Sequence, residues 1–230
     1  MWRLSSCLLC LIAFNFQLLK AQAHPNVSSL PIEEIPGDGN QSTLIVYITG
    51  DGGWNKFSEG IGRSFAQRGY SFVALNARKY FWETKTPEIF SGDIETLINH
   101  YLRIWNKTKC IIVGYSFGAD VAAFLPSRLT KSLLSKIQFT TLISPSASTD
   151  FVIRLSDLFG ASDGKDRKYR VDHELEKTPS PVFCIFGEEE ELILKKELHS
   201  NSKISIEELP GAHQFNHETD LLVAHILDRL

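Results

Sequence analysis

The chain has 230 residues, of which 43% are hydrophobic, 22% charged and 11% aromatic. This composition can bury one sizeable core, which excludes a disordered chain, a collagen-like fibre and a protein embedded in the membrane throughout. Lysine and arginine number 24 against 27 aspartates and glutamates, a formal net charge of −3. Because there is no basic excess to neutralise phosphates, nucleic acid is not an expected partner.

The amino terminus is typical of a secretory signal peptide. Arg3 precedes an apolar stretch over 8–19, and Ala21-Gln22-Ala23 forms a cleavage site of the A-x-A kind. The apolar stretch is too short to be a comfortable membrane span. We therefore expect residues 1–23 to be removed, the alternative being an uncleaved anchor, and the mature protein to be periplasmic or secreted.

The rest of the chain predicts one α/β domain. Residues 24–41 are rich in proline, serine and acid and predict an irregular leader that reaches a domain over 42–230. In that domain, apolar runs predict strands at 43–48, 70–75, 110–113, 137–143, 181–186 and 203–209, and amphipathic stretches predict helices at 57–67, 87–105, 117–127 and 218–230. Runs such as 44–48 and 110–113 lack polar alternation, as expected of a mostly parallel sheet with helices on both faces.

The segment 144–180 and the two cysteines of the domain do not by themselves indicate a function. Residues 144–180 are less regular and form either a lid over a site or a plain surface excursion. Cys110 and Cys184 lie in apolar runs, so we expect buried free thiols, since a disulfide would need adjacent strands. No cluster of cysteine and histidine has the spacing of metal ligands, and we expect neither a metal nor a cofactor.

The motif that carries chemistry is Gly-Tyr-Ser-Phe-Gly at 114–118. It follows a predicted strand and leads into a predicted helix, which is the context of a G-x-S-x-G nucleophile elbow. The turn is so sharp that side chains at Gly114 and Gly118 would collide, while Ser116 projects its hydroxyl above the sheet. We predict that Ser116 is a nucleophile, the alternative being an ordinary glycine-rich turn.

A serine hydroxyl needs a base, and the elbow fold predicts the chain order serine, acid, histidine. His213 lies in the segment 209–215, just after a predicted strand, where a loop can bring the imidazole over the elbow. We predict that His213 is the base. His217, four residues on, is the alternative, although a histidine near a helix start is more often a surface residue.

The acid is expected after the strand at 181–186, where Gly187 is followed by four glutamates. Catalytic groups collect at the carboxyl ends of strands in open α/β sheets. The usual place is three residues after the glycine, which favours Glu190 over Glu191 and Glu189. This carboxylate would accept the second N–H of the histidine and fix its tautomer. The competing interpretation is a solvated run of charge.

Two backbone N–H groups are expected to stabilise the oxyanion. One belongs to Phe117, next to the nucleophile, and the other should come from the glycine-rich loop 50–54, with Asp51 or Gly52 as the donor. A bare glycine turn is the alternative. A phosphate-binding loop is also a less favoured interpretation, because the sequence has neither G-x-x-x-x-G-K-S/T nor G-x-G-x-x-G at this place.

Four motifs in order make a resemblance specific: 50–54 (GDGGW), 80–82 (YFW) with 86–88 (TPE), 114–120 (GYSFGAD) and 209–215 (LPGAHQF). Together they resemble the bacterial virulence protein VirJ family, which includes the carboxyl-terminal domain of AcvB. The resemblance covers about 50–217. It implies an α/β-hydrolase-like periplasmic protein and, for AcvB-like members, hydrolysis of lysyl-phosphatidylglycerol.

The sequence departs from the family pattern in two places. The cysteine expected shortly after the acidic loop is absent, with leucine, isoleucine, leucine and lysine at 192–195. Gln214 and Asn216 stand where a histidine and an acid are expected beside His213. Both departures leave Ser116 and His213 intact. They weaken the transfer of the family's catalytic acid and substrate to this chain.

The resemblance also offers candidate substrate-binding residues: Trp54, Tyr80, Trp82 and Asp120. Carried over from the family, the aromatic triplet 80–82 would line the entrance to the site, whereas by base rate it would be core packing. Asp120 would contact a cationic substrate or, as we favour, support the start of the helix after the elbow.

The leading hypothesis is a serine hydrolase that cleaves an ester, with an aminoacylated phospholipid as substrate and a membrane surface as a candidate contact. The first alternative is a non-catalytic protein of the same fold that binds proteins of a secretion system, because fold alone permits it. The second is a generic carboxylesterase or lipase.

Overall fold

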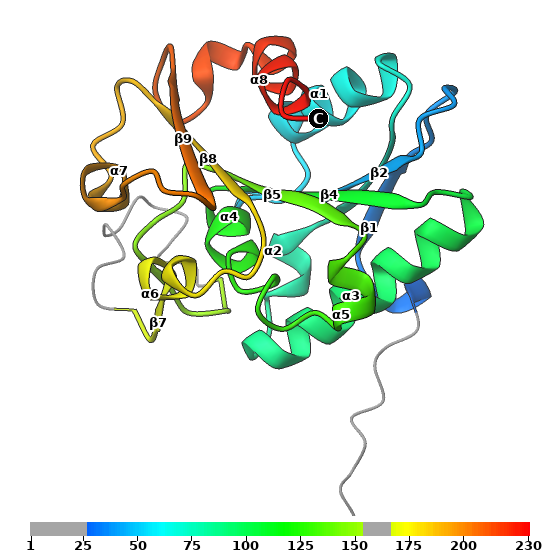
Figure 1. Ribbon diagram of the computed structural model, residues 1–230, viewed down its shortest axis with the longest axis horizontal. Helices are drawn as coiled ribbons and strands as arrows, with labels where there is room; N and C mark the ends of the chain where they lie inside the picture. Colours follow the sequence, from blue (N-terminus) through cyan, green and yellow to red (C-terminus); the bar gives the residue numbers. More distant parts are fainter. Residues whose placement is uncertain (1–26, 154–166) are drawn as a thin grey trace, which may run out of the picture.

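The computed structural model describes residues 27–153 and 167–230; the predicted signal peptide lies outside them. Their main feature is a seven-stranded sheet with the order β1-β3-β2-β4-β5-β8-β9 (Figure 1). The strands are β1 Ile32–Ile35, β2 Thr43–Ile48, β3 Ser71–Leu75, β4 Lys109–Tyr115, β5 Ile137–Ile143, β8 Val182–Gly187 and β9 Ile204–Leu209. All neighbouring strands are parallel except β1 and β3. The six strands expected from the sequence are thus present, with ends that differ by up to two residues.

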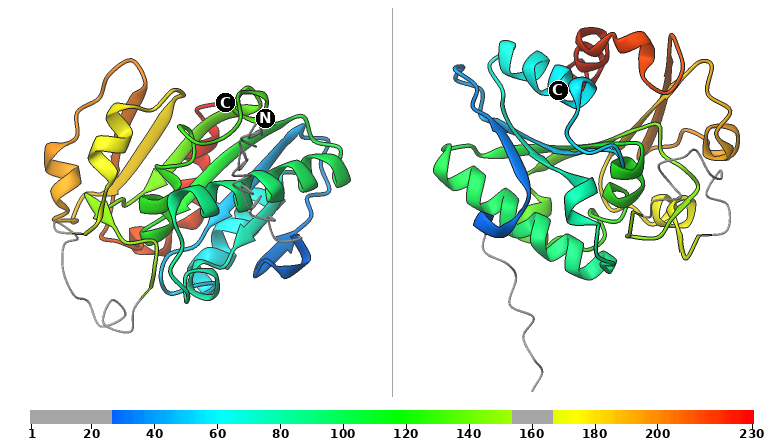
Figure 2. Two further views of the ribbon diagram at one scale, coloured as in Figure 1. Left: turned by 90° about the horizontal axis from the view of Figure 1, so that it is seen from below. Right: turned by 180° about the vertical axis from the view of Figure 1, so that it is seen from behind.

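Helices cover both faces of this sheet (Figures 1 and 2). On one face α1, Lys56–Gln67, packs beside α8, Thr219–Leu227. The other face carries α2 Ala77–Tyr80, α3 Pro87–Ile104, α4 Phe117–Ala122, α5 Lys131–Leu134 and α6 Val171–Glu176. The short helix α7, Ile193–Glu197, follows β8. The chain also forms the 3-10 turns η1, Val27–Ser29, and η3, Phe215–His217.

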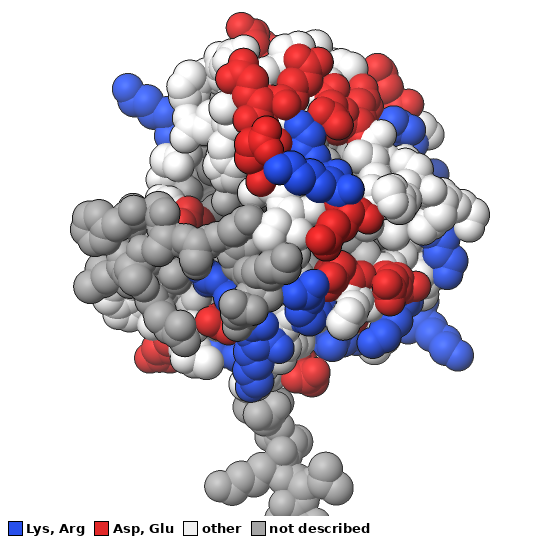
Figure 3. Space-filling model, turned by 90° about the vertical axis from the view of Figure 1, so that its left-hand side faces the viewer, with Lys and Arg blue, Asp and Glu red and all other residues white. Residues whose placement is uncertain are grey.

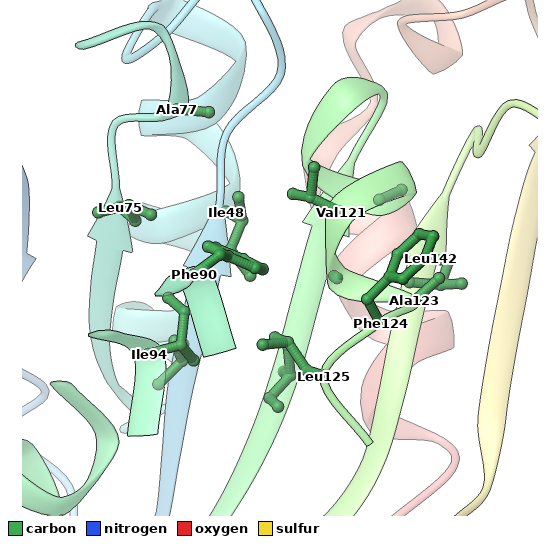
Figure 4. Packing of buried hydrophobic residues seen from close by; sticks show 14 of the residues in the cluster. Ile48, Leu75, Ala77, Phe90, Ile94, Val121, Ala123, Phe124, Leu125 and Leu142 are labelled. Atoms are coloured by element: carbon green, nitrogen blue, oxygen red, sulfur yellow. The ribbon is translucent and has the colours of Figure 1, made fainter. Parts of the chain in front are cut away.

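Two apolar clusters explain why the strands lack polar alternation. Every residue of β2 is buried, because its side chains point alternately into the cluster under α1 and α8 and into the cluster under α3 and α4. In the second cluster, Phe90 and Ile94 of α3 pack over Ile48 and Leu75 at the carboxyl ends of β2 and β3 (Figure 4). The α/β fold class predicted from the sequence is confirmed.

The prediction of an irregular leader was wrong for Val27–Ser29, which form the turn η1, and for four further residues. Ile32–Ile35 form β1, which pairs antiparallel with β3 at the edge of the sheet. A strand of four residues with two adjacent glutamates is too short and too polar to show a clear period of two, which is why the sequence did not reveal it.

Two further segments differ from expectation. The helix expected over 117–127 ends at Ala122 and continues as turns. Within 144–180, the strands β6, Ser148–Thr149, and β7, Tyr169–Arg170, pair with each other and α6 follows. The remainder of that segment, 154–166, lies outside the described residues, so the choice between a lid and a surface excursion stays a prediction.

Cys110 and Cys184 are free and buried, as expected. They lie in β4 and β8, which are separated by β5, so they do not face each other across neighbouring strands. Burial raises the pKa of the Cys184 thiol to about 12 and raises that of Cys110 as well. Within 27–153 and 167–230, no helix is both long and apolar enough to cross a membrane.

Candidate active site

Ser116 occupies a strained turn between β4 and α4. Its backbone has φ 53° and ψ −123°, a conformation that residues other than glycine rarely adopt. A Cβ atom on Gly114 would lie 2.4 Å from the carbonyl oxygen of Gly118, and one on Gly118 would lie 2.2 Å from that of Ile48. Only glycine fits at either position, so the structure has the sharp strand-to-helix turn that the motif predicts.

A chain of hydrogen bonds connects Ser116, His213 and Glu190. The Nε2 atom of His213 lies 2.9 Å from Ser116 Oγ, and its Nδ1 atom lies 2.5 Å from Glu190 Oε1. With an ionised carboxylate as acceptor, the ring proton sits on Nδ1 and leaves Nε2 free to accept the serine proton. We call these three residues the Ser–His–Glu trio. The loops after β4, β8 and β9 bring them together at the carboxyl edge of the sheet.

The carboxylate of Glu190 accepts further hydrogen bonds besides the one from His213. Its side chain is only 4% exposed, and its second oxygen, Oε2, accepts the backbone N–H of Gly187 at 2.6 Å and the hydroxyl of Ser144 at 2.8 Å. Burial acts to raise the pKa of Glu190, but the hydrogen bonds from His213, Gly187 and Ser144 outweigh it, and the pKa is lowered. The carboxylate therefore stays ionised and points in one direction.

The alternatives weighed from the sequence lie elsewhere. Glu189 and Glu191 are exposed, and Glu191 pairs with Lys196. His217 is exposed, with its ring edge-on to Phe57 at 6.4 Å between centroids. A turn closed by the hydrogen bond from Glu190 N–H to the Gly187 carbonyl explains why one glutamate of the four points inward.

Two residues that support the trio were missed in the sequence. Tyr115 donates its hydroxyl to the carbonyl of His213 at 3.0 Å, and its ring lies against the imidazole, 5.2 Å between centroids. Ser144 is the first residue after β5 and has φ 53°. The position of Ser144 at the carboxyl end of a buried strand could have indicated its role. The position of Tyr115 inside the elbow motif could have done the same.

Backbone N–H groups beside Ser116 are not used by the helix or the turn to which they belong. Phe117 is the first residue of α4, so its N–H has no partner inside the helix. In the loop after β2, Gly53 N–H donates to the Gly50 carbonyl at 3.0 Å, a turn bond that does not use the N–H groups of Asp51 and Gly52. A Cβ on Gly50 would lie 3.4 Å from Ser116 Cβ, so this turn sits directly beside the serine.

Two of the four candidate substrate-binding residues are buried, which favours the structural alternative that the sequence analysis gave for each. Tyr80 is buried, donates its hydroxyl to Asp93 at 2.5 Å and packs edge-on against Phe81. Asp120 is buried too, and its Oδ1 accepts the backbone N–H of Ser146 at 2.6 Å. Burial raises the pKa of Asp120 to about 8. Both side chains are structural because the apolar faces of α2 and α4 turn toward the core.

The other two candidates share one pocket. Trp54 and Trp82 line a cavity of about 540 Å³ together with Gly52, Gly53, Asn76, Arg78 and Lys79. A second pocket, of about 620 Å³, has Asn55, Phe57, Gln214 and His217 among its lining residues. In the described part of the chain, no group of three or more histidines, cysteines or acids could hold a metal ion.

Solved structures share this fold at low sequence identity. Est1E from Butyrivibrio proteoclasticus is 13% identical, with a TM-score of 0.60 over 86% of this chain and 92% of that chain. A lipase-esterase related protein from Clostridium acetobutylicum is 14% identical, with a TM-score of 0.61 over 87% and 99%. Proline iminopeptidase from Mycobacterium smegmatis is 12% identical, with a TM-score of 0.61 over 86% and 94%. The fold is that of the α/β hydrolases.

The sequence assigns the chain to a smaller group of proteins than the fold does. A comparison with curated protein sequences gives no significant match. The model of the family described as bacterial virulence protein (VirJ) matches residues 42–230, which span the parallel strands and all three residues of the trio. The chain therefore belongs to the VirJ family of bacterial virulence proteins.

Proposed function

We propose that this protein is a serine hydrolase that cleaves an ester through an acyl-enzyme. His213 Nε2 takes the hydroxyl proton of Ser116 as Oγ bonds to the ester carbonyl carbon, and the carbonyl electrons move to oxygen, beside the N–H of Phe117. When the intermediate collapses, the bond to the alcohol breaks and the alcohol leaves with the proton from His213. Water then attacks the acyl-enzyme in the same way and restores Ser116.

The observation that carries this proposal is the unbroken path from Glu190 through His213 to Ser116, with distances of 2.5 Å and 2.9 Å. Such a path activates the hydroxyl, and Glu190, ionised and fixed at both oxygens, stabilises the imidazolium that forms. The likeness to structures named as esterases agrees with this chemistry without assigning it.

For the substrate, we propose the aminoacyl ester of lysyl-phosphatidylglycerol, on the strength of the family and of the charges near the trio. A lysyl group carries two ammonium charges. Asp51 lies within electrostatic reach of the elbow, because its charge adds to the rise in pKa of both Tyr115 and Asp120. Glu188 and Glu189 are exposed in the loop of Glu190. A cation would be attracted to these carboxylates.

The surface charge is consistent with that attraction. Figure 3 shows the side of the molecule on which α6 and α7 lie. Acidic side chains gather across the upper part of this face, and most of the basic ones lie lower. We place the reaction at a membrane surface outside the cytoplasm, which rests on the signal peptide expected at 1–23.

The test is to give the purified protein lysyl-phosphatidylglycerol and phosphatidylglycerol in parallel, and to measure free lysine and free fatty acid. We expect lysine from the first lipid, no fatty acid from either, and neither product from Ser116→Ala. Fatty acid without lysine would contradict the aminoacyl substrate and favour a lipase. Neither product, together with no labelling by a fluorophosphonate, would favour a binding protein of a secretion system.

A further inference from the structure

The pocket of Trp54 and Trp82 is not used by the Ser–His–Glu trio. One of its indoles is anchored and the other is free. Trp54 packs on the core residue Phe72, at 6.2 Å between ring centroids, whereas Trp82 is 57% exposed. Trp82 follows the fully buried Phe81, so its backbone is fixed although its ring faces solvent. The exposed indole gives the mouth of the pocket an apolar ring with a polar N–H, the kind of side chain that is enriched at interfaces.

Two cations complete the wall of this pocket. Arg78 and Lys79 are adjacent on α2, both exposed, and in the ranges 27–153 and 167–230 neither has a carboxylate partner. The nearby Lys85, by contrast, is paired with Glu83. Two unpaired positive charges at one pocket favour an anionic ligand.

The pocket adjoins the turn that offers N–H groups to the oxyanion. Gly52 and Gly53 belong both to that turn and to the pocket wall. The turn rests on the start of α2, since a Cβ on Gly53 would lie 2.8 Å from Asn76 Oδ1 and 3.1 Å from the Cβ of Arg78. A ligand whose ester is at Ser116 can therefore place a neighbouring group in this pocket.

We propose that this pocket binds the phosphodiester of a phosphatidylglycerol headgroup, with or without a lysyl group on it, with Arg78 and Lys79 on the phosphate and the two indoles at the level of the headgroups. Indoles prefer the interface between membrane and water, and cations close to an anionic membrane add to binding. This inference rests on the proposed function and extends it: the acidic groups near the trio face the aminoacyl cation, and the pocket holds the phosphate of the same lipid.

The test measures binding and does not depend on turnover. Ser116→Ala protein is sedimented with vesicles of phosphatidylglycerol mixed with phosphatidylcholine and with vesicles of phosphatidylcholine alone. In that background, Arg78→Gln/Lys79→Gln removes the pocket's two charges. Lys131→Gln/Lys136→Gln removes two exposed charges, one at the start of α5 and one directly before β5, and is the matched control.

We expect preference for the anionic vesicles in the Ser116→Ala protein and in the control, and a loss of about 30-fold in the pocket variant, because each basic group contributes on the order of a factor of five. Trp82→Ala should weaken vesicle binding several-fold. Equal binding by pocket variant and control, or no preference for phosphatidylglycerol, would overturn the proposal.

A free phosphate is the other source of the same chemistry. Inorganic phosphate at millimolar concentration should neither change the tryptophan fluorescence nor displace the vesicles. If it does both, the pocket takes a soluble phosphate and the lipid proposal fails. Vesicle binding without ester hydrolysis by the protein with Ser116 intact would support the pocket and contradict the proposed function, and hydrolysis without vesicle preference would do the reverse.

Discussion

The Ser–His–Glu trio and the tryptophan pocket lie beside each other and are built in opposite ways. In the trio, Glu190 is buried and hydrogen-bonded at both oxygens, and His213 is bonded at both ring nitrogens. In the pocket, Arg78 and Lys79 are exposed and without ion-pair partners among the described residues.

The difference separates two tasks. A reacting group must be oriented before the substrate arrives, so its partners are supplied by the protein itself, from backbone and buried side chains. A recognising group gains most when its partner is the ligand, so it is left unpaired. Substitutions in the trio and its supports should therefore change the rate of hydrolysis strongly even when a single side chain is replaced.

The largest effect is expected for Ser116→Ala. Because the trio acts as a unit, loss of the nucleophile should lower kcat on the order of 10⁶-fold. The fold should remain, since the hydroxyl contacts only His213 in the described chain. Steady-state kinetics and circular dichroism check both parts. Retained hydrolysis would show that another group is the nucleophile.

Glu190→Gln should lower the rate by about 10⁴-fold, because an amide cannot fix the histidine tautomer as a carboxylate does. Glu191→Gln is the matched control, because Glu191 is the next residue, is exposed and is paired with Lys196 away from the trio. The ratio of kcat/KM between the two variants measures how much burial and bonding distinguish one carboxylate from its neighbour. Similar rates would place the acid elsewhere.

Ser144→Ala tests the support behind the acid. It removes the 2.8 Å hydrogen bond to Glu190 Oε2. A hydrogen bond to a charged group contributes roughly 1.5–3 kcal/mol, so kcat should fall roughly 10- to 100-fold if the bond orients the carboxylate. The same loss should raise the pKa of Glu190 and move the acid limb of the pH–rate profile upward. Ser132→Ala, on the distant α5, should do neither.

The smallest effect on the rate of hydrolysis is expected for Asp120→Asn, which changes stability instead. The pKa of Asp120 is about 8 in the folded protein against an ordinary 3.8, so the folded state holds a proton that the unfolded state releases. The free energy of unfolding should therefore fall as the pH rises between these two values, with a slope of at most about 1.4 kcal/mol for each pH unit.

The variant should lose that dependence. An asparagine amide oxygen can still accept the Ser146 N–H, and it has no charge to bury. Urea unfolding at pH 5 and pH 8.5 should give similar stability for the two proteins at the lower pH and a more stable variant at the higher one. The same slope with pH in both would mean that Asp120 is ionised in the folded state throughout.

The sequence was sufficient where one requirement dominates. Strands such as β2 and β4 were found because each contains an unbroken apolar run, and the elbow because only glycine fits at 114 and 118. It was insufficient where tertiary contacts decide. Ser144 and Tyr115 act through partners 46 and 98 residues away. Tyr80 and Trp82 belong to one aromatic triplet, yet the first faces the core and the second faces solvent.

The central claim is that Ser116 is an activated nucleophile, and a fluorophosphonate tests it most directly because the reagent needs the serine and its base but no particular substrate. The purified protein should gain one adduct, which peptide mass spectrometry should locate on Ser116. Glu190→Gln should label much more slowly and Ser116→Ala not at all. A folded protein in which Ser116 stays unmodified at high reagent concentration would contradict the account.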